Sequence, residues 1–401
     1  MRNRSRRIIV CSAVIFLTLA GTQSYIFSQS SPDERPQLKD FGSSLKRLKW
    51  DSKKQTTVEK KRAGKPGDSA ADDVIRVETN LVVCDVQVRD KDGKTVLGLT
   101  KENFIVTEDG RPQRMQHFSL GNDLKVGRSI VLLIDYSGSE SPYINNSVEG
   151  AKVLVDQLGP KDTVAIVTDD VEMLVDFTRD KVKLKKALDS LKTKSGQHKF
   201  GRSKQFSALM ATVRELFTPE DIRPIVIFQT DGDQVFHLQP SIPQILSIPD
   251  KIPESWHGGD IEPFSLRDLY HAIERSRASI YTVIPGPRLI EVSSSRDLKT
   301  TETVIGDKQK IYSMRDLYRW GQLAAAGAAI GGWTTYLLKP EDALDIYARI
   351  LADINSRYVI GYYPINKEHD GKRRKVLVEV RDHPEYSVSG RKSYIAPEPE
   401  L

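Results

Sequence analysis

Cysteine is scarce in this sequence, and so are long apolar runs. Cys11 and Cys84 are the only two cysteines in 401 residues, which is too few for a disulfide framework or a cysteine-based zinc site. The apolar stretch Leu323–Leu338 is 16 residues long and contains three glycines and two threonines. A helix that spans a bilayer needs roughly 20 apolar residues. We therefore expect this stretch to form a buried helix followed by a strand, with no stable membrane span beyond the N-terminal leader.

The sequence also lacks the common motifs of catalytic sites. It contains no G-x-S-x-G elbow, no H-E-x-x-H pair and no Walker loop. Its seven histidines are scattered, without the spacing of metal ligands. The formal charge of +6 comes largely from arginines in the N-terminal leader, so the remainder is nearly neutral. This balance gives no reason to expect a nucleic-acid partner, and we expect no enzyme activity.

The first 30 residues have the layout of a secretory signal peptide. Four arginines precede the apolar run Ile8–Ala20, and small residues follow near Ser30. Residues 31–73 are rich in Lys, Ser, Asp, Gly and Pro, which predicts a disordered linker. The expected location is therefore secreted or periplasmic, with anchoring in the membrane if the leader is not cleaved.

The remaining sequence predicts an α/β domain between two β units. Residues 74–120 and 357–396 show strand-like alternation separated by polar turns. Between them, residues 128–355 alternate buried strands with amphipathic helices, which is typical of a doubly wound, mostly parallel sheet. The two β units are expected to pack together as one small β-sandwich, because domain termini tend to lie close together.

Oxygen-bearing side chains follow two of the predicted central strands. The apolar run of Ile130–Ser139 stops at Asp135, and the hydroxyls of Ser137 and Ser139 follow. Asp231 ends the strand Pro224–Thr230 in the same way, and Ser203 begins a helix between them. In open α/β sheets, ligands bind beyond the carboxyl ends of the strands. Two carboxylates and three hydroxyls there are suitable ligands for a hard cation such as Mg²⁺, although the same residues can also serve only as caps of helices and turns.

These motifs resemble a known metal site. The pattern D-x-S-x-S at Asp135–Ser139, followed by T-D-G at Thr230–Gly232, is similar to the metal-ion-dependent adhesion site (MIDAS) of von Willebrand factor type A domains. That family has a threonine where this sequence has Ser203, and the adjacent Arg202 and Lys204 are unfavourable for a bound cation. The flanking phrases VRDKDGKTVLGLTKENFIVTEDGRPQ and YVIGYYP resemble the secreted Acidobacterial proteins related to this family.

The resemblance implies a binding protein. In such a domain the metal shell is completed by an acidic side chain of a partner protein. Carried over to this sequence, Ser137, Ser139 and Ser203 contact Mg²⁺ directly, and Asp135 and Asp231 hold it directly or through water. Mn²⁺ and Ca²⁺ are alternative ions. Two other functions stay open: a scaffold that binds through its β-sandwich and has a vestigial metal site, and a metal-dependent hydrolase.

Overall fold

The computed structural model describes residues 81–194, 203–217, 221, 223–239, 262–285, 321–327 and 331–397. It also describes the backbone of two short hairpins, which pair β1 (Leu48–Asp51) with β2 (Thr56–Glu59) and β12 (Glu302–Ile305) with β13 (Lys308–Ile311). The sequence patterns did not predict these hairpins: the first lies in the expected linker, and the second lies within the segment 128–355 that was expected to form the α/β domain. The predicted leader, residues 1–30, lies outside the described residues, as do most of the linker and residues 74–80.

A six-stranded sheet forms the centre of the α/β domain, in the order β14-β11-β10-β7-β8-β9. Every neighbouring pair is parallel except β8 and β9, which are antiparallel. The strands are β7 (Arg128–Ile134), β8 (Thr163–Thr168), β9 (Glu172–Thr178), β10 (Arg223–Gln229), β11 (Ser279–Pro285) and β14 (Thr334–Leu337). All residues of β7, β10 and β11 are buried. This is why their sequences run apolar without alternation.

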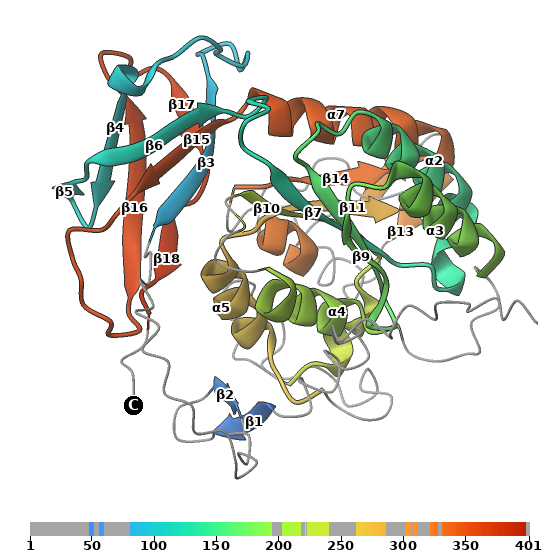
Figure 1. Ribbon diagram of the computed structural model, residues 1–401. Coiled ribbons are helices and arrows are strands. Elements are labelled where there is room, and N and C mark those ends of the chain that lie inside the picture. Colours follow the sequence, from blue (N-terminus) through green and yellow to red (C-terminus); the bar gives the residue numbers. More distant parts are fainter. Residues whose placement is uncertain are drawn as a thin grey trace, which may run out of the picture. The chain divides into compact units, whose positions relative to one another are not determined.

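Helices cover both faces of this sheet (Figure 1). Side chains of α2 (Ser141–Asp156), α3 (Lys181–Lys194) and α7 (Ala343–Ser356) pack in one apolar cluster. Side chains of α4 (Gln205–Ala211), α5 (Leu266–Ser276) and the helical residues 321–327 pack in the other. A π-helical turn, Thr212–Leu216, extends α4. The predicted doubly wound, mostly parallel architecture is confirmed.

Short 3₁₀ helices occur in four connections of the described chain: Lys101–Asn103, Gly138–Glu140, Asp233–His237 and Pro340–Asp342. The stretch Leu323–Leu338 contributes to a buried helix and then to β14. This agrees with the prediction of a buried helix followed by a strand. None of the helices in the described part of the chain combines the length and the apolar character that crossing a bilayer requires.

The N- and C-terminal β units form one sandwich, as predicted. Its two four-stranded sheets have the orders β17-β3-β15-β6 and β18-β16-β4-β5. The strands are β3 (Val82–Arg89), β4 (Phe104–Glu108), β5 (Arg111–Pro112), β6 (Met115–Leu120), β15 (Tyr358–Tyr362), β16 (Arg373–Val380), β17 (Ser387–Ser389) and β18 (Ser393–Ile395). Strands from both ends of the chain pair within each sheet. Their inner faces share one apolar core, in which burial raises the pKa of Cys84 to about 11, so its thiol is unreactive.

A buried ion pair joins the sandwich to the α/β domain. Arg223 begins β10, and its Nη2 lies 3.0 Å from Oδ2 of Asp85 on β3. The same guanidinium donates to the carbonyls of Gly121 and Ile354 at 2.7 and 3.1 Å. The sandwich therefore contacts the end of the sheet where the parallel strands begin. The opposite end, where they finish, is left for the candidate site.

Candidate metal centre

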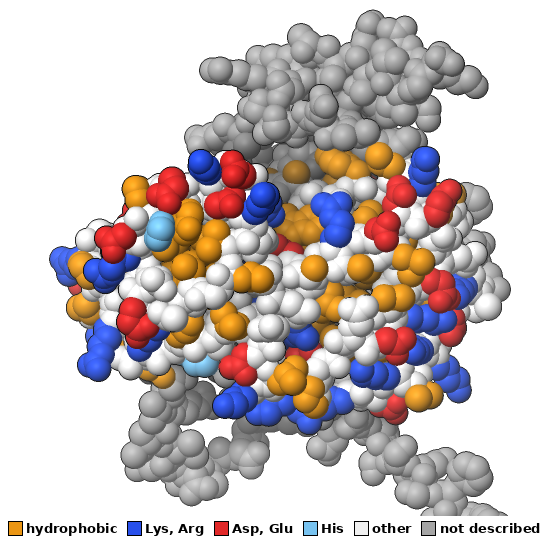
Figure 2. Space-filling model, turned by 90° about the horizontal axis from the view of Figure 1, so that it is seen from above, with side chains coloured by type: hydrophobic (Ala, Val, Ile, Leu, Met, Phe, Trp, Pro, Cys, Tyr) orange, Lys and Arg blue, Asp and Glu red, His pale blue; other side chains and the backbone are white. Residues whose placement is uncertain are grey.

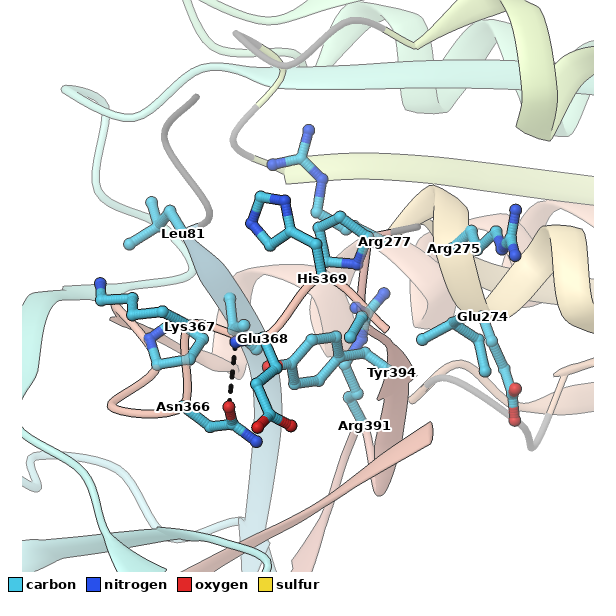
Figure 3. A pocket seen from close by; sticks show the side chains of 15 residues that line it. Leu81, Glu274, Arg275, Arg277, Asn366, Lys367, Glu368, His369, Arg391 and Tyr394 are labelled. Atoms are coloured by element: carbon cyan, nitrogen blue, oxygen red, sulfur yellow. Dashed lines mark hydrogen bonds between the residues drawn. The ribbon is translucent and has the colours of Figure 1, made fainter. Parts of the chain in front are cut away.

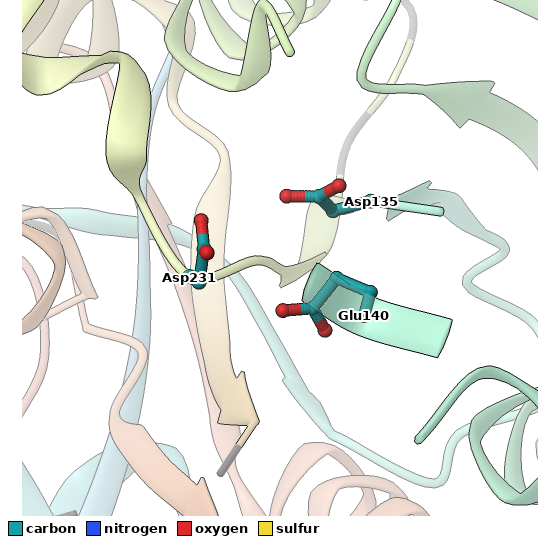
Figure 4. A group of neighbouring side chains, drawn as sticks. All are labelled: Asp135, Glu140 and Asp231. Atoms are coloured by element: carbon teal, nitrogen blue, oxygen red, sulfur yellow. The ribbon is translucent and has the colours of Figure 1, made fainter. Parts of the chain in front are cut away.

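Three buried carboxylates meet at the carboxyl end of the central strands. Asp135 follows β7, Asp231 follows β10, and Glu140 ends the 3₁₀ turn that leads into α2. One carboxylate oxygen from each lies within 4.8 Å of the others, and the three side chains face a common space (Figure 4). Such a group of oxygens, brought together by two neighbouring parallel strands, is suited to a hard divalent cation.

Hydrogen bonds fix Asp135 at the centre of this group. Its Oδ1 accepts a hydrogen bond from the backbone N–H of Ser137 at 3.0 Å. Its Oδ2 accepts from Nε2 of Gln205 at 2.9 Å and from Oγ1 of Thr230 at 3.1 Å. The backbone N–H of Asp135 also donates to the carbonyl of Gln229, at 3.0 Å, so the ends of β7 and β10 stay in register.

Gln205 connects the two aspartates. Its Nε2 also lies 3.3 Å from Oδ1 of Asp231, and its Oε1 accepts from the backbone N–H of Gln234. The Asp231 loop depends on Gly232, which has a positive φ of 77°. A Cβ on Gly232 would lie 2.7 Å from Leu323 Cδ1, so both conformation and space favour glycine there. These constraints hold the two carboxylates close together before any ion is bound.

The three predicted serine hydroxyls lie on the same edge of the sheet. Ser137 is half-buried and Ser139 exposed, and their Oγ atoms are 3.1 Å apart. Ser203 Oγ lies 3.5 Å from Asp135 Oδ1 and donates to Oδ2 of Asp169 at 2.5 Å. The structure thus brings together all five residues that the sequence predicted as ligands. Lys204 forms an ion pair with Glu262, with 3.2 Å between the charged atoms. Its charge is therefore paired with a carboxylate that is not one of the five predicted ligands. Arg202 lies outside the described residues.

The electrostatics of the site favour a cation. Burial, reinforced by the charge of Asp169, raises the pKa of Asp135 to about 7. Burial also raises the pKa of Asp169 to about 6. Carboxylates are expensive to ionise when they are buried beside one another, and a bound divalent ion reverses that penalty. The donor set consists of carboxylate and hydroxyl oxygens, which fits Mg²⁺, Mn²⁺ or Ca²⁺.

Comparison with known proteins agrees with this geometry. The family model described as the von Willebrand factor type A domain matches residues 130–234, a segment that contains all five predicted ligands and Glu140. The chain contains a von Willebrand factor type A domain. No curated protein matches the sequence significantly.

Several solved structures resemble this A domain protein at low identity. The conserved hypothetical protein BatB from Bacteroides thetaiotaomicron is 16% identical, with 57% of this chain and 98% of that one covered and a TM-score of 0.37. The vWF domain of the type V pili tip protein Mfa5 from Porphyromonas gingivalis is 14% identical, with 57% and 95% covered and a TM-score of 0.36. A structure of mussel byssus proximal thread matrix protein 1 with a zinc-occupied MIDAS motif is 13% identical, with 57% and 48% covered and a TM-score of 0.34.

Three polar residues of the A domain site were missed by the sequence reasoning. Glu140 directly follows the D-x-S-x-S motif, but an acidic residue at the start of a helix is usually exposed to solvent, so the sequence gave no reason to place it in the site. Asp169 follows β8 as Asp135 follows β7, so a search for acids after every buried strand would have found it. Gln205 gave no signal, because a glutamine at the start of a helix is ordinary. Its role appears only when α4 is placed between the two aspartates.

Proposed function

We propose that this A domain binds a divalent cation, Mg²⁺ in the first instance, and uses it to capture an acidic side chain of a partner protein. The observation that carries this proposal is the convergence of Asp135, Asp231 and Glu140, with their oxygens within 4.8 Å, beside the hydroxyls of Ser137 and Ser203. The bound ion would supply a positive charge with an open coordination position. The chain supplies the carboxylates that hold it, and Ser139, which is exposed, marks the side that a partner can reach.

The role we infer is binding rather than catalysis. The cluster is built from carboxylates, without a histidine or cysteine among its described members. Ser203 donates its hydroxyl to Asp169, and that acid is held in turn by the backbone N–H of Tyr136 at 3.2 Å. We infer that these bonds position the ligands rather than prepare a nucleophile. The arginine-rich leader supports the further proposal that binding takes place in the periplasm or outside the cell.

The face shown in Figure 2 supports a protein partner more than a nucleic acid. On the face shown in Figure 2, basic and acidic side chains are interspersed, and neither sign gathers into an extended patch. Association would then depend on the ion and on local contacts, because long-range attraction by net charge is weak.

The test is calorimetric titration of Mg²⁺ and Mn²⁺ into the whole protein and into its Asp135→Ala variant. We expect saturable binding in the wild type and none in the variant, whose far-ultraviolet circular dichroism should stay unchanged. Immobilised peptides with Asp or Glu, and matched peptides with Asn or Gln, then probe the partner chemistry. Retention should require both the acid and the ion. Equal ion binding by the variant would remove the basis of the proposal.

The sandwich offers a second binding surface, and its exposed apolar side chains are the observation in its favour. Leu97, Leu377, Tyr363 and Ile365 are all at least 42% exposed there. If the metal site is vestigial, retention of a partner should persist in chelator and should fall when Ile365, at 60% exposure, is changed to Ser. Loss of retention in chelator would assign the binding to the metal site instead.

A further inference from the structure

A cleft of about 300 Å³ is lined by the end of α5 and by residues of the sandwich, and none of the candidate metal ligands lines it (Figure 3). It is bounded by Leu81 before β3, by the end of α5, by the loop that contains Asn366, and by the C-terminal strands around Tyr394. Its volume is at the lower end of the range for pockets that hold small molecules.

Arg391 is buried in the wall of this cleft, and its guanidinium forms no ion pair with another described residue. The residue is 5% exposed, and its Nη2 is buried without a hydrogen bond. Nowhere in the described chain does its guanidinium meet a carboxylate as an ion pair. A buried guanidinium is normally paired, because desolvating its charge is costly. The N–H donors on Nη2 of Arg391 are therefore left without an acceptor beside this cleft.

The backbone around Arg391 is rigidly placed. The chain crosses here from β17 in one sheet of the sandwich to β18 in the other. A Cβ on the preceding Gly390 would lie 2.7 Å from Cγ1 of Val86 and 3.0 Å from the carbonyl of Asp85, so the crossing packs directly on β3. The carbonyl of Lys392 accepts from the N–H of Val376 at 2.9 Å. The arginine is thus held on a fixed scaffold, as a binding residue requires.

The nearby acids are engaged elsewhere. Glu274 lines the cleft, but its Oε2 accepts from Arg373 at 2.9 Å and its Oε1 lies 3.5 Å from the hydroxyl of Ser393. Asp85 lines a small space behind Arg391; its Oδ2 accepts from Arg223 at 3.0 Å, and its Oδ1 is buried without a hydrogen bond. Neither carboxylate forms an ion pair with Arg391, although the charge of Glu274 favours the ionised guanidinium.

A second guanidinium increases the positive charge. Arg277 lines both the cleft and the small space behind it. It ends α5 with a φ of 63°, a left-handed conformation that is usual for glycine and uncommon for arginine. Burial lowers the pKa of the Arg391 guanidinium, and the charge of Arg277 acts in the same direction. Arg277 has interactions of its own, so an anion in this cleft would be held by Arg391, whose guanidinium forms no ion pair within the described residues.

We propose that this cleft binds a small organic carboxylate, with the carboxylate on Arg391 and an apolar body against Leu81, Pro364 and Ile395. The planar guanidinium fork matches a carboxylate in two parallel hydrogen bonds. Glu274 and Glu368 also line the cleft, so a singly charged group is favoured over a doubly charged phosphate. The proposal is independent of the metal centre.

The experiment is calorimetric titration of benzoate into the whole protein, with benzamide as its neutral counterpart and phenyl phosphate as the doubly charged one. The test variant is Arg391→Met. The control variant is Arg111→Met, because Arg111 is exposed on β5 and lies outside the cleft. We expect benzoate to bind and benzamide to bind at least about tenfold more weakly. The affinity of Arg391→Met for benzoate should be lower than that of the wild type by a similar factor. The affinity of Arg111→Met for benzoate should equal that of the wild type.

Thermal unfolding without ligand gives a second readout. Replacing an unpaired buried charge by an apolar side chain should raise the Tm of Arg391→Met, whereas removing a structural arginine lowers it. Any one of three results would overturn the proposal. They are equal affinity for benzoate and benzamide, unchanged benzoate binding by Arg391→Met, and a lower Tm of that variant than of the wild type. Tighter binding of phenyl phosphate than of benzoate would overturn the choice of a carboxylate.

Discussion

Replacing Asp135 by asparagine removes one buried titrating group and isolates its effect on stability. In the folded protein without a divalent ion, the pKa of Asp135 is raised from 3.8 to about 7. Because the folded pKa is the higher one, the unfolded chain ionises first as the pH rises. The protonated folded form is therefore favoured at low pH, and stability is lost as the pH rises from about 4 towards 7.

The size of the effect follows from the shift. At 1.36 kcal/mol per pKa unit, the full window corresponds to roughly 4 kcal/mol, of which about 2–3 kcal/mol is lost between about pH 5 and pH 8. For a folded chain of this size, about 1 kcal/mol moves Tm by roughly 2–4 °C. The difference between the wild type and Asp135→Asn should therefore change by about 5–10 °C across that interval.

The assay is thermal or urea unfolding of both proteins at the two pH values, first in chelator and then in Mg²⁺. Groups that do not interact with Asp135 cancel in the difference, so the remaining pH dependence belongs to Asp135 and its charge interaction with Asp169. In chelator the wild type should lose stability relative to the variant as the pH rises. Mg²⁺ at about 100 times its Kd should then restore about 2.7 kcal/mol to the wild type alone. Parallel pH profiles in chelator, or equal stabilisation of both proteins by Mg²⁺, would refute the reasoning.

Two further predictions concern the fold. In Gly332→Ala the new Cβ would lie 1.6 Å from the carbonyl oxygen of Ile280, so we expect the free energy of unfolding to fall by about 3 kcal/mol, or the protein not to fold. In the control Gly138→Ala the new Cβ would have nothing within 4 Å, so its free energy of unfolding should lie within about 0.5 kcal/mol of the wild type. Arg223→Met leaves Asp85 without its cation at the junction between the sandwich and the α/β domain, and urea unfolding should show a loss of about 3–5 kcal/mol. A loss no greater than that of an exposed arginine would show that the junction contributes little.

Much of the fold was predictable because its signals are local. The apolar run of β7 and the similar run of β10 identify buried parallel strands, and each is followed at once by its acid. Alternation in β16, whose side chains are exposed and buried in turn, identifies a half-buried antiparallel strand. Pairing of the N- and C-terminal β units was also predicted, although alternation shows only that strands need partners. The hairpins β1–β2 and β12–β13 were missed, since their surroundings are polar.

The sequence by itself was enough to predict candidate ligands of the proposed metal site: Asp135, the serines after it, and Asp231, each marked by its position at the end of a strand. Only the tertiary structure decided what joins them. Gln205 bridges the two aspartates, and Glu140 completes the group of three carboxylates. Asp169 comes close to this group because the sheet order places β8 beside β7. The isolation of Arg391 is likewise invisible in the sequence. The polarity of a residue is a local property, but the partners available to a buried charge depend on every segment that folds around it.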